Sequence, residues 1–558
     1  MQKIFIKNKW IFLLVIISFI PLADLLRPGL PLGHDTQDHV ARIANFYQNI
    51  QEGNIVPRWA GNLNWGYGHP IIMFLYPFPS YLGSFFHFLN FSLVDSVKIV
   101  FMLGFLLSGF SMFLWIKNVF GAKEGFVAGL LYTLAPYRFV DLYVRGAIGE
   151  NFFFIWPPLV CYFLYKLSRE YKWIYLAGGA FSTALMMLSH NALTIMFFPF
   201  VFFYALTLLL TKNKNKLLFA VYCLLFTVFG FALSAFFWLP AFFEGKYTLR
   251  DIVTTGEYVN RFETINRLIY SDWTFGGSGS FSVQIGILQW LFLLAAPILL
   301  VYLLRRKDKN SKLVLLSIIS FAVSIFLMLP ISKPIYETIT ILQKFQFPWR
   351  FLSLAVFSPA IIGGILISLV PKKKKTIFTF LILVVLLLLN KDYWRAKDYQ
   401  IKPDIFYSGV YHGTTDTGES APIWSVRFME KEPKAPLEIV EGSGRVKIIE
   451  RKSTKHVYDL DITSFKARVL ENTLYFPGWF VYVDGKELNI VDVLFQDPNY
   501  RGLLNFFLDK GNHRVEIVFR ETRLRQIADI ISGISLFFLA FLWPIFLWRL
   551  PHTMKKKI

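Results

Sequence analysis

The chain has 558 residues, of which 55% are hydrophobic and only 17% charged, and its formal net charge is +21. This composition excludes a soluble globular protein and indicates a polytopic membrane protein. The basic residues stand in short runs between apolar segments, a pattern that is typical of cytoplasmic loops and argues against nucleic-acid binding.

The chain begins with a basic stretch and an apolar one, as a signal sequence does, but no small-x-small cleavage site follows. We interpret this stretch as an uncleaved first span. Further segments approach the roughly 20 apolar residues that are needed to cross a bilayer. Twelve spans are predicted in all, and they centre on 10–26, 96–116, 124–137, 151–167, 173–188, 192–210, 217–239, 284–304, 313–330, 351–370, 376–390 and 526–549.

A further apolar segment, 71–90, decides the sidedness of everything after it. If it does not cross, the runs "KLSREYK", "TKNKNK", "RRKDKNSK" and "PKKKK" all fall in the cytoplasm together with both termini. If it does cross, they fall outside, against the positive-inside tendency. Because Pro77 and Pro79 also interrupt it, we predict a juxtamembrane or re-entrant helix pair within a first outer loop, 27–95. The outer face then collects 27–95, 138–150, a turn at 189–191, 240–283, 331–350 and 391–525.

From about residue 391 the charge rises, and runs such as "RVKIIER" and "HVYDLDI" have the period of half-buried strands. Asp484-Gly485 fits a two-residue hairpin turn, and Lys510-Gly511-Asn512 marks a second turn. We predict an extracytoplasmic β-sandwich over 391–525, then a last span and a basic cytoplasmic tail over 526–558. The sandwich either binds a sugar or polymer or serves as a packing cap over the membrane domain.

Candidate catalytic residues stand in the first outer loop. In "GHDTQDH", Asp35, Asp38 and His39 have the spacing that places them on one face of a helix. The apolar-polar rhythm that continues to Gly53 predicts an amphipathic helix along the membrane surface. The alternative is that Asp35 or Thr36 is simply the N-cap of that helix.

Other outer segments hold charges of both signs. Arg145 and Glu150 stand where two predicted spans meet water, although anchoring at the interface is the alternative for the arginine. In "LQKFQFPWRF", Lys344 and Arg350 place positive charge on the outer side, which favours pairing with an anion such as phosphate. Glu244 adds a second acidic group.

The sequence contains no Walker A loop, dinucleotide glycine fingerprint, HExxH or CxxC motif. A soluble nucleotide from the cytoplasm is therefore not the expected substrate. A donor that is carried by a lipid, with its head group at the outer surface, matches acids in one outer loop and arginines in others.

The order of "GHDTQDH", "VPRWAGNLNWGYGHPIIMFLYPFPSYL", "DLYVRGAIGE", "FPWRF" and "YFPGWFVYVDGK" resembles the 6-pyruvoyl-tetrahydropterin-synthase-related membrane family, close to the YfhO-like proteins. An acidic first outer loop followed by juxtamembrane helices and many spans also resembles the GT-C superfamily of membrane glycosyltransferases. The resemblance covers about 10–370 and 470–520, and it implies a GT-C-like α-helical membrane domain over 1–390.

The resemblance implies transfer of a sugar from a polyprenyl-phosphate carrier to an extracytoplasmic glycan, lipid or polymer. Asp35 would be the general base and Asp38 a second acid. The donor phosphate would be bound by Arg145, Arg350 and Lys344, and the supporting or acceptor-binding residues would be His39, His69, Glu150 and Glu244. A divalent cation, Mg²⁺ or Mn²⁺, stays open, because "DTQD" departs from a strict DxD pair but has histidines beside it.

Two other functions compete with glycosyl transfer. A transporter or flippase for a lipid-linked glycan would line its path with the same charges, although the sequence lacks evident inverted repeats and charges deep within spans. A non-catalytic assembly protein would capture a wall polymer on its sandwich. All three functions are those of a plasma-membrane protein. The charge of the loops predicts that both termini lie in the cytoplasm.

Overall fold

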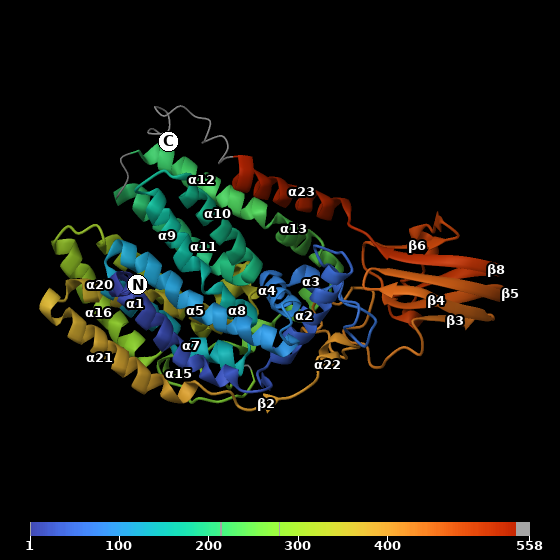
Figure 1. Cartoon of the computed structure of the whole chain (residues 1–558), viewed down its shortest axis with the longest axis horizontal. Helices are drawn as coiled ribbons and strands as arrows, with labels where there is room; N and C mark the ends of the chain where they lie inside the picture. Colours follow the sequence, from blue (N-terminus) through green and yellow to red (C-terminus); the bar gives the residue numbers. More distant parts are fainter. Residues whose placement is uncertain (1, 212–214, 278, 543–558) are drawn as a thin grey trace.

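The computed structural model describes residues 2–211, 215–277 and 279–542. A helical body fills one end of the molecule, and an antiparallel sheet extends from its other end (Figure 1). The start of α1 lies at the end of the helical body that is away from the sheet. The fold class is thus the predicted one, an α-helical membrane domain followed by a β domain.

Each of the twelve predicted spans coincides with a helix. The helices are α1 (Gln2–Phe19), α5 (Leu93–Val119), α6 (Ala122–Thr133), α9 (Trp156–Leu167), α10 (Trp173–Ser189), α11 (Asn191–Thr211), α12 (Lys216–Leu233), α16 (Ile287–Arg305), α17 (Ser311–Met328), α20 (Leu352–Leu369), α21 (Lys372–Asn390) and α23 (Arg523–Phe537). The end of the last predicted span, from residue 543 on, lies outside the described residues.

The predicted number of spans is not confirmed. Within the described residues, nine helices are long and apolar enough to cross a membrane. The helices α6 and α9 have 12 residues each and α10 has 17. A 12-residue helix rises only about 18 Å, whereas the hydrocarbon core is about 30 Å thick. Short helices that follow one another therefore take the place of single long spans in this part of the body.

The segment 71–90 forms two short helices, α3 (Ile71–Phe74) and α4 (Phe78–Phe88). Pro77 is the N-cap of α4, and Pro79 follows in its first turn. Proline is tolerated there because the first N–H groups of a helix have no partner within it. The predicted helix pair is confirmed, and neither helix is long enough to span a membrane.

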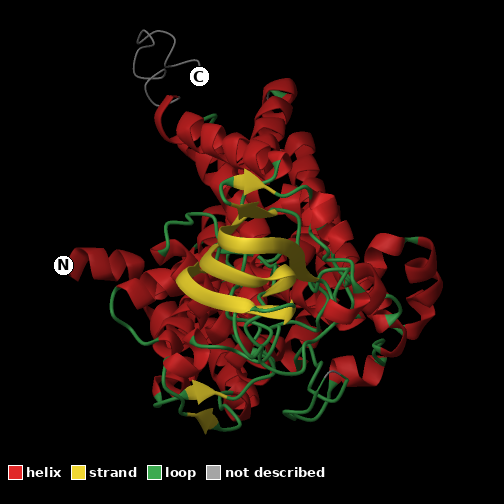
Figure 2. Cartoon of the chain, turned by 90° about the vertical axis from the view of Figure 1, so that its right-hand side faces the viewer, coloured by secondary structure: helices red, strands yellow, loops and turns green. Residues whose placement is uncertain are grey.

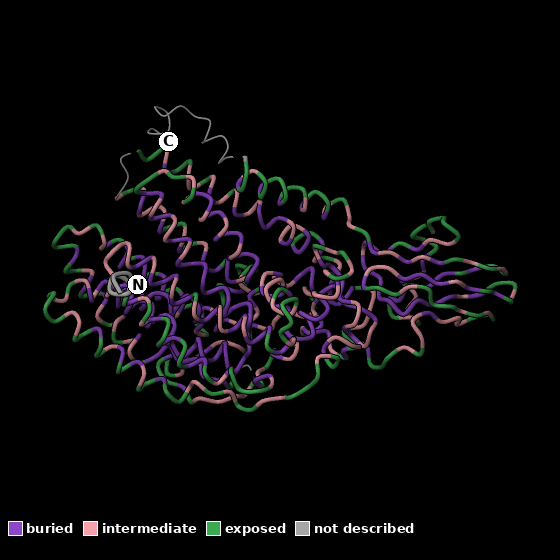
Figure 3. The backbone as a smooth tube through the Cα atoms, in the orientation of Figure 1, coloured by how far each residue is buried: buried purple, intermediate pink, exposed green. Residues whose placement is uncertain are grey.

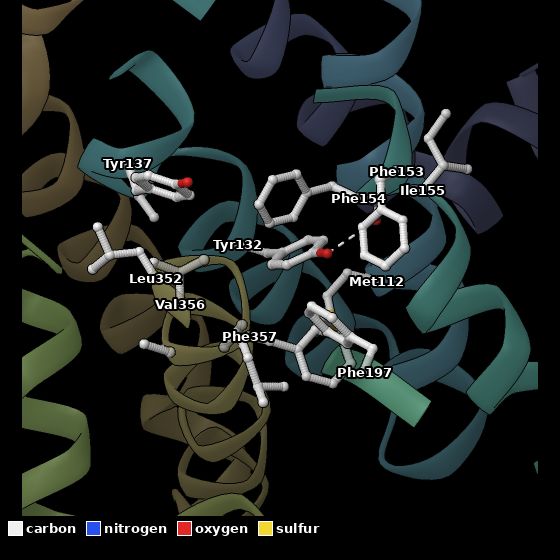
Figure 4. Close-up of a cluster of buried hydrophobic side chains, with 14 of the residues drawn as sticks. Met112, Tyr132, Tyr137, Phe153, Phe154, Ile155, Phe197, Leu352, Val356 and Phe357 are labelled. Atoms are coloured by element: carbon white, nitrogen blue, oxygen red, sulfur yellow. Dashed lines mark hydrogen bonds between the residues drawn. The ribbon is translucent and has the colours of Figure 1, made fainter. Parts of the chain in front are cut away.

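Aromatic rings form the centre of the helical body, where buried residues are densest (Figure 3). The Phe357 ring on α20 lies 5.5 Å from that of Phe197 and 5.7 Å from that of Tyr132, between ring centroids. The Tyr132 hydroxyl donates to the Phe154 carbonyl at 2.9 Å, so this buried polar group has a partner (Figure 4).

Strands β3 to β8 form one six-stranded antiparallel sheet, so the predicted sandwich is not confirmed, and β2 (Tyr399–Gln400) pairs instead with β1 (Leu30–Pro31). Its curvature is visible in Figure 2. Both β3 and β4 pair with β5, at its two ends, and β8 pairs with the other edge of β5. The strands are β3 (Leu437–Glu441), β4 (Gly444–Lys452), β5 (Lys455–Leu474), β6 (Trp479–Val483), β7 (Lys486–Glu487) and β8 (Leu503–Phe519).

The two predicted turns have different outcomes. Asp484 and Gly485 have φ of 50° and 80° and join β6 to β7, so the predicted hairpin turn is confirmed. The predicted turn at Lys510-Gly511-Asn512 is wrong, because these residues lie inside β8, where Gly511 pairs with Ile462 of β5. The irregularity is in the partner strand, since β5 bulges between Ile462 and Lys466.

Candidate functional site

The first outer loop is held by the segment that precedes α8 (Ile148–Phe153). The backbone N–H groups of His34 and Asp35 donate to the carbonyls of Val144 and Arg145, at 3.0 and 2.9 Å. Gly146 has a φ of 63°, and a Cβ there would lie 2.3 Å from Thr36 Cγ2. The glycine is therefore required for this close approach, which places Asp35 beside the loop that carries Arg145.

Asp35 occupies the N-cap position of α2 (Thr36–Gln51), but its side chain makes no capping hydrogen bond and is exposed. The Thr36 hydroxyl closes the turn instead. It accepts from the Gly33 N–H at 3.1 Å and donates to the Pro31 carbonyl at 2.8 Å. Asp35 is therefore the N-cap of α2 by position, as the alternative interpretation has it, but its carboxylate does not bond the first N–H groups of the helix.

Asp38 is half-buried and lies under a segment from the C-terminal region. Its Oδ1 accepts from the Tyr411 hydroxyl at 2.7 Å, and that hydroxyl accepts from Gln37 Nε2 at 2.8 Å. Burial raises the pKa of the Asp38 carboxyl, and the Tyr411 hydrogen bond and the charge of Arg42 oppose that rise. Asp38 is thus engaged within the protein, unlike Asp35.

His39 is buried and packs with Arg42 one turn later on α2. Arg42 Nη1 donates to His39 Nδ1 at 2.8 Å, and its other nitrogens donate to the carbonyl and hydroxyl of Thr415. Burial and the adjacent guanidinium hold the pKa of His39 well below its usual value. A neutral His39 therefore positions Arg42 and does not supply a proton.

Arg145 belongs to a buried ion network with Asp141 and Glu150. Arg145 Nη1 lies 2.7 Å from Glu150 Oε2 and 2.5 Å from Asp141 Oδ1. Glu150 Oε1 accepts from the Tyr137 hydroxyl at 2.6 Å and from the Ser353 hydroxyl of α20 at 2.9 Å. The positive charge of Arg145 is therefore balanced by carboxylates within the protein.

Arg350 lies in the turn Pro348–Phe351, which begins the apolar stretch of α20. Its Nη1 donates to the Phe345 carbonyl at 2.9 Å and lies 3.4 Å from Gln346 Oε1. These acceptors are uncharged, and the buried Arg350 Nε has no partner among the described residues. The neighbouring Trp349 ring lies 4.5 Å from the Arg145 guanidinium, so the two arginines are adjacent.

Tyr76, between α3 and α4, packs against the residue before Glu150 and against His190. A Cβ on Gly149 would lie 2.0 Å from the Tyr76 ring, and the His190 ring stacks on Tyr76 at 5.0 Å. Burial raises the pKa of the Tyr76 phenol, on which the charges of Arg42, Asp35, Arg350 and Glu150 also act. These four charged residues come from three chain segments, namely 35–42, α8 and the turn before α20. Neither Tyr76 nor His190 was expected in this site, because a Tyr within an apolar segment gives no local signal of function.

Three other predicted site residues have different partners. Lys344 pairs with Asp251 at 2.9 Å, and both side chains are exposed. His69 is buried, with its Nε2 3.5 Å from Asp416 Oδ1. Glu244 accepts from Arg525 Nε and from the Thr522 hydroxyl, both at 2.8 Å. The structure thus places each of these three residues in contact with another side chain of the protein.

A metal site was left open by the sequence. Within the described part of the chain, no three His, Cys, Asp or Glu side chains are grouped as they would have to be to hold a metal ion. Dependence on a divalent cation stays a prediction.

Comparison with known proteins places these residues in a wider context. A family model described as 6-pyruvoyl-tetrahydropterin synthase related domain, membrane protein, matches residues 73–396. An uncharacterized protein from Lactococcus lactis subsp. cremoris is 25% identical over 236 residues, which are 41% of this chain and 38% of that protein. The chain thus matches well under half the length of this curated relative.

Three solved structures are similar to parts of the chain. The arabinofuranosyltransferase AftD from Mycobacteria has a TM-score of 0.43 at 15% identity, over 69% of this chain and 27% of AftD. The Archaeoglobus fulgidus oligosaccharyltransferase in its apo form has a TM-score of 0.43 at 13% identity, over 73% and 56% of the two chains. ArnT from Cupriavidus metallidurans, bound to undecaprenyl phosphate, has a TM-score of 0.40 at 16% identity, over 68% and 64%.

The Glu244–Arg525 pair joins α13 (Ala235–Phe243) to the start of α23, and both side chains are buried. We expect Glu244→Gln to lower the free energy of unfolding by about 3 to 5 kcal/mol, because it leaves a buried guanidinium without its counter-charge. The measurement is denaturant unfolding of the purified protein in detergent. Glu170→Gln, which breaks an exposed pair with Lys172, is the matched control and should leave the unfolding midpoint unchanged. Equal shifts in the two variants would contradict the structural role of Glu244.

Proposed function

The chain belongs to the 6-pyruvoyl-tetrahydropterin synthase related family of membrane proteins, and we propose that it is a GT-C-type glycosyltransferase of the plasma membrane. It transfers a sugar from a polyprenyl-phosphate carrier to an acceptor on the outer face. The pterin chemistry in the family's description does not fit, because such an enzyme would need a zinc site of histidines, and no metal-binding group of this kind occurs among the described residues.

One observation carries the proposal. An exposed carboxylate, Asp35, is fixed through its backbone to the loop of Arg145, and the Arg145 guanidinium lies 4.5 Å from the ring of Trp349, which precedes Arg350 in the sequence. An exposed acid thus lies beside the loop of Arg145, and Arg350 stands at the start of the apolar stretch of α20. Such a juxtaposition suits a reaction between a polar acceptor and an anionic head group that is carried by a lipid.

In the proposed reaction, the Asp35 carboxylate accepts the proton of an acceptor hydroxyl as its oxygen attacks the anomeric carbon of the donor. A new carbon–oxygen bond forms while the bond from that carbon to the phosphate oxygen breaks. The electron pair leaves with the polyprenyl phosphate, and a single displacement of this kind inverts the anomeric centre. Asp38 is a positioning residue, because its carboxylate is held by Tyr411.

We assign the contact with the leaving phosphate to Arg350. Its hydrogen bonds go to uncharged oxygens, so its positive charge is available as negative charge develops on the phosphate. Arg145 supports the site from behind, since Glu150 and Asp141 already balance its charge. Arg42, held by Thr415 and His39, contributes to the positive potential.

We expect Asp35→Asn to reduce glycosyl transfer at least about a hundredfold, because it removes the general base. Membranes that contain the variant are incubated with polyprenyl-phosphate sugars labelled in the sugar, and transfer into the acceptor fraction is counted. Asp251→Asn, a change of an exposed carboxylate in another outer segment, should retain wild-type transfer. Full activity of Asp35→Asn, or movement of labelled lipid across vesicles without any transfer, would contradict the proposal and favour a transporter.

The proposed sidedness has its own test. In a protein without Cys161 and Cys223, a cysteine is placed at exposed Lys486 of the sheet or at exposed Lys309 between α16 and α17. A membrane-impermeant maleimide should label the first variant in intact cells and the second only after the membrane is permeabilised. This result follows if basic turns stay in the cytoplasm. Labelling of Lys309→Cys in intact cells would contradict the proposed topology and indicate the reverse one.

A further inference from the structure

A polar pocket lies along the C-terminal half of α2, away from Asp35. Its volume is about 720 Å³. It is bounded by the C-terminal half of α2, the end of α4, the residues that precede α5, and α22 (Ile405–Ser408). These elements are seen beside one another near the junction with the sheet (Figure 1). The pocket shares no lining residue with the cluster around Tyr76 and Arg350.

The lining is rich in primary amides. Asn62 Nδ2 donates to Gln48 Oε1 and to the Ser408 carbonyl, both at 2.8 Å. Gln51 Nε2 donates to the Tyr47 hydroxyl at 3.1 Å. These bonds fix the amides in place, while the Asn62 and Gln51 carbonyl oxygens and the Tyr47 hydroxyl proton are not consumed by them. The wall therefore offers both donors and acceptors at fixed positions.

Aromatic rings form another part of the wall. The rings of Tyr47 and His87 meet edge to face, with centroids 4.6 Å apart. His87 Nδ1 lies 2.8 Å from the Phe91 carbonyl oxygen, so Nδ1 carries the proton and Nε2 is an acceptor. An apolar ring surface next to amides and an acceptor nitrogen matches a ligand with C–H faces and hydroxyl edges.

The charge of the pocket narrows the ligand class. No Lys or Arg lines it, and its one carboxylate, Asp404, accepts from the Leu93 N–H at the start of α5. A phosphate or a uronic acid would find no cation here, and its negative charge would face the Asp404 carboxylate. Hydroxyl groups, which donate and accept at once, fit the amides without any charge.

We propose that this pocket binds an uncharged saccharide, and that it is the subsite which holds the acceptor glycan. The assignment to the acceptor rests on the proposed function, whereas the binding of a neutral sugar does not. Gln48 stands thirteen residues after Asp35 on α2, about 20 Å along a helix with a rise of 1.5 Å per residue. A subsite at that distance would hold a chain of several sugars by a part remote from the reacting hydroxyl.

The test is direct binding to the full-length protein in lipid nanodiscs, since sugar-based detergents would compete. The probes are neutral hexose and pentose tetrasaccharides, with uronic-acid tetrasaccharides and inorganic phosphate as charged counterparts. Wild type should bind at least one neutral probe and neither charged one. Gln48→Ala and Tyr47→Ala should each weaken binding about tenfold, which corresponds to the loss of one hydrogen bond or ring contact.

Gln526→Ala, at an exposed glutamine outside the pocket, is the matched control and should bind as wild type does. Asp35→Asn should also bind as wild type does, whether or not it transfers sugar, so failure of the proposed reaction is distinguishable from failure of this site. Equal binding by the pocket variants and the control, stronger binding of a charged probe, or no binding of any neutral probe would each overturn the inference.

Discussion

The ion pair between Arg145 and Glu150 is the interaction on which the arrangement of the site depends. Both side chains are buried, and a buried charge without its partner costs far more than the pair contributes. Glu150 also accepts from Ser353 on α20, so the pair ties the N-terminal end of that helix to α8. The backbone carbonyls of Val144 and Arg145, just before α8, accept hydrogen bonds from the backbone of the first outer loop. The position of Asp35 thus depends on charges that are buried within the protein.

A second constraint comes from the segment 409–420, which crosses the first outer loop before the sheet begins. Tyr411 exchanges backbone hydrogen bonds with that loop, through Asn62 and Trp65. The nearby His69 and the backbone N–H groups of this segment hold the pKa of Asp416 below its usual range, although burial opposes them. Asp416 therefore stays ionised and fixes the segment. The site is therefore complete only when segment 409–420, which follows the membrane helices in the sequence, packs against the first outer loop.

Local patterns predicted the elements of this protein better than they predicted its site. The helix after Asp35, the helix pair around Pro77 and the hairpin at Gly485 depend on neighbours in sequence, which a period or a turn residue reveals. The turn expected at Gly511 was overridden by pairing with a distant strand. The partners of Glu244 and His69 stand hundreds of residues away, and no spacing announces them. Asp35, Arg145, Glu150 and Arg350 were selected for their charge in outer segments, and the structure places them in one region.

Because the site depends on contacts with the C-terminal region, deletion of that region does not distinguish the competing functions. A protein that acts only by capturing polymer on its sheet would lose function when 391–525 is removed, but so would the transferase. That deletion removes the hydrogen bonds that Tyr411 and Thr415 make with side chains of α2. It also removes Trp479, whose ring lies 5.5 Å from that of Trp59 in the first outer loop. Substitution at a surface position of the sheet avoids this difficulty. Phe465, in the bulge of β5, is 88% exposed, so a change there alters the surface of the sheet and leaves the contacts that support Asp35 intact.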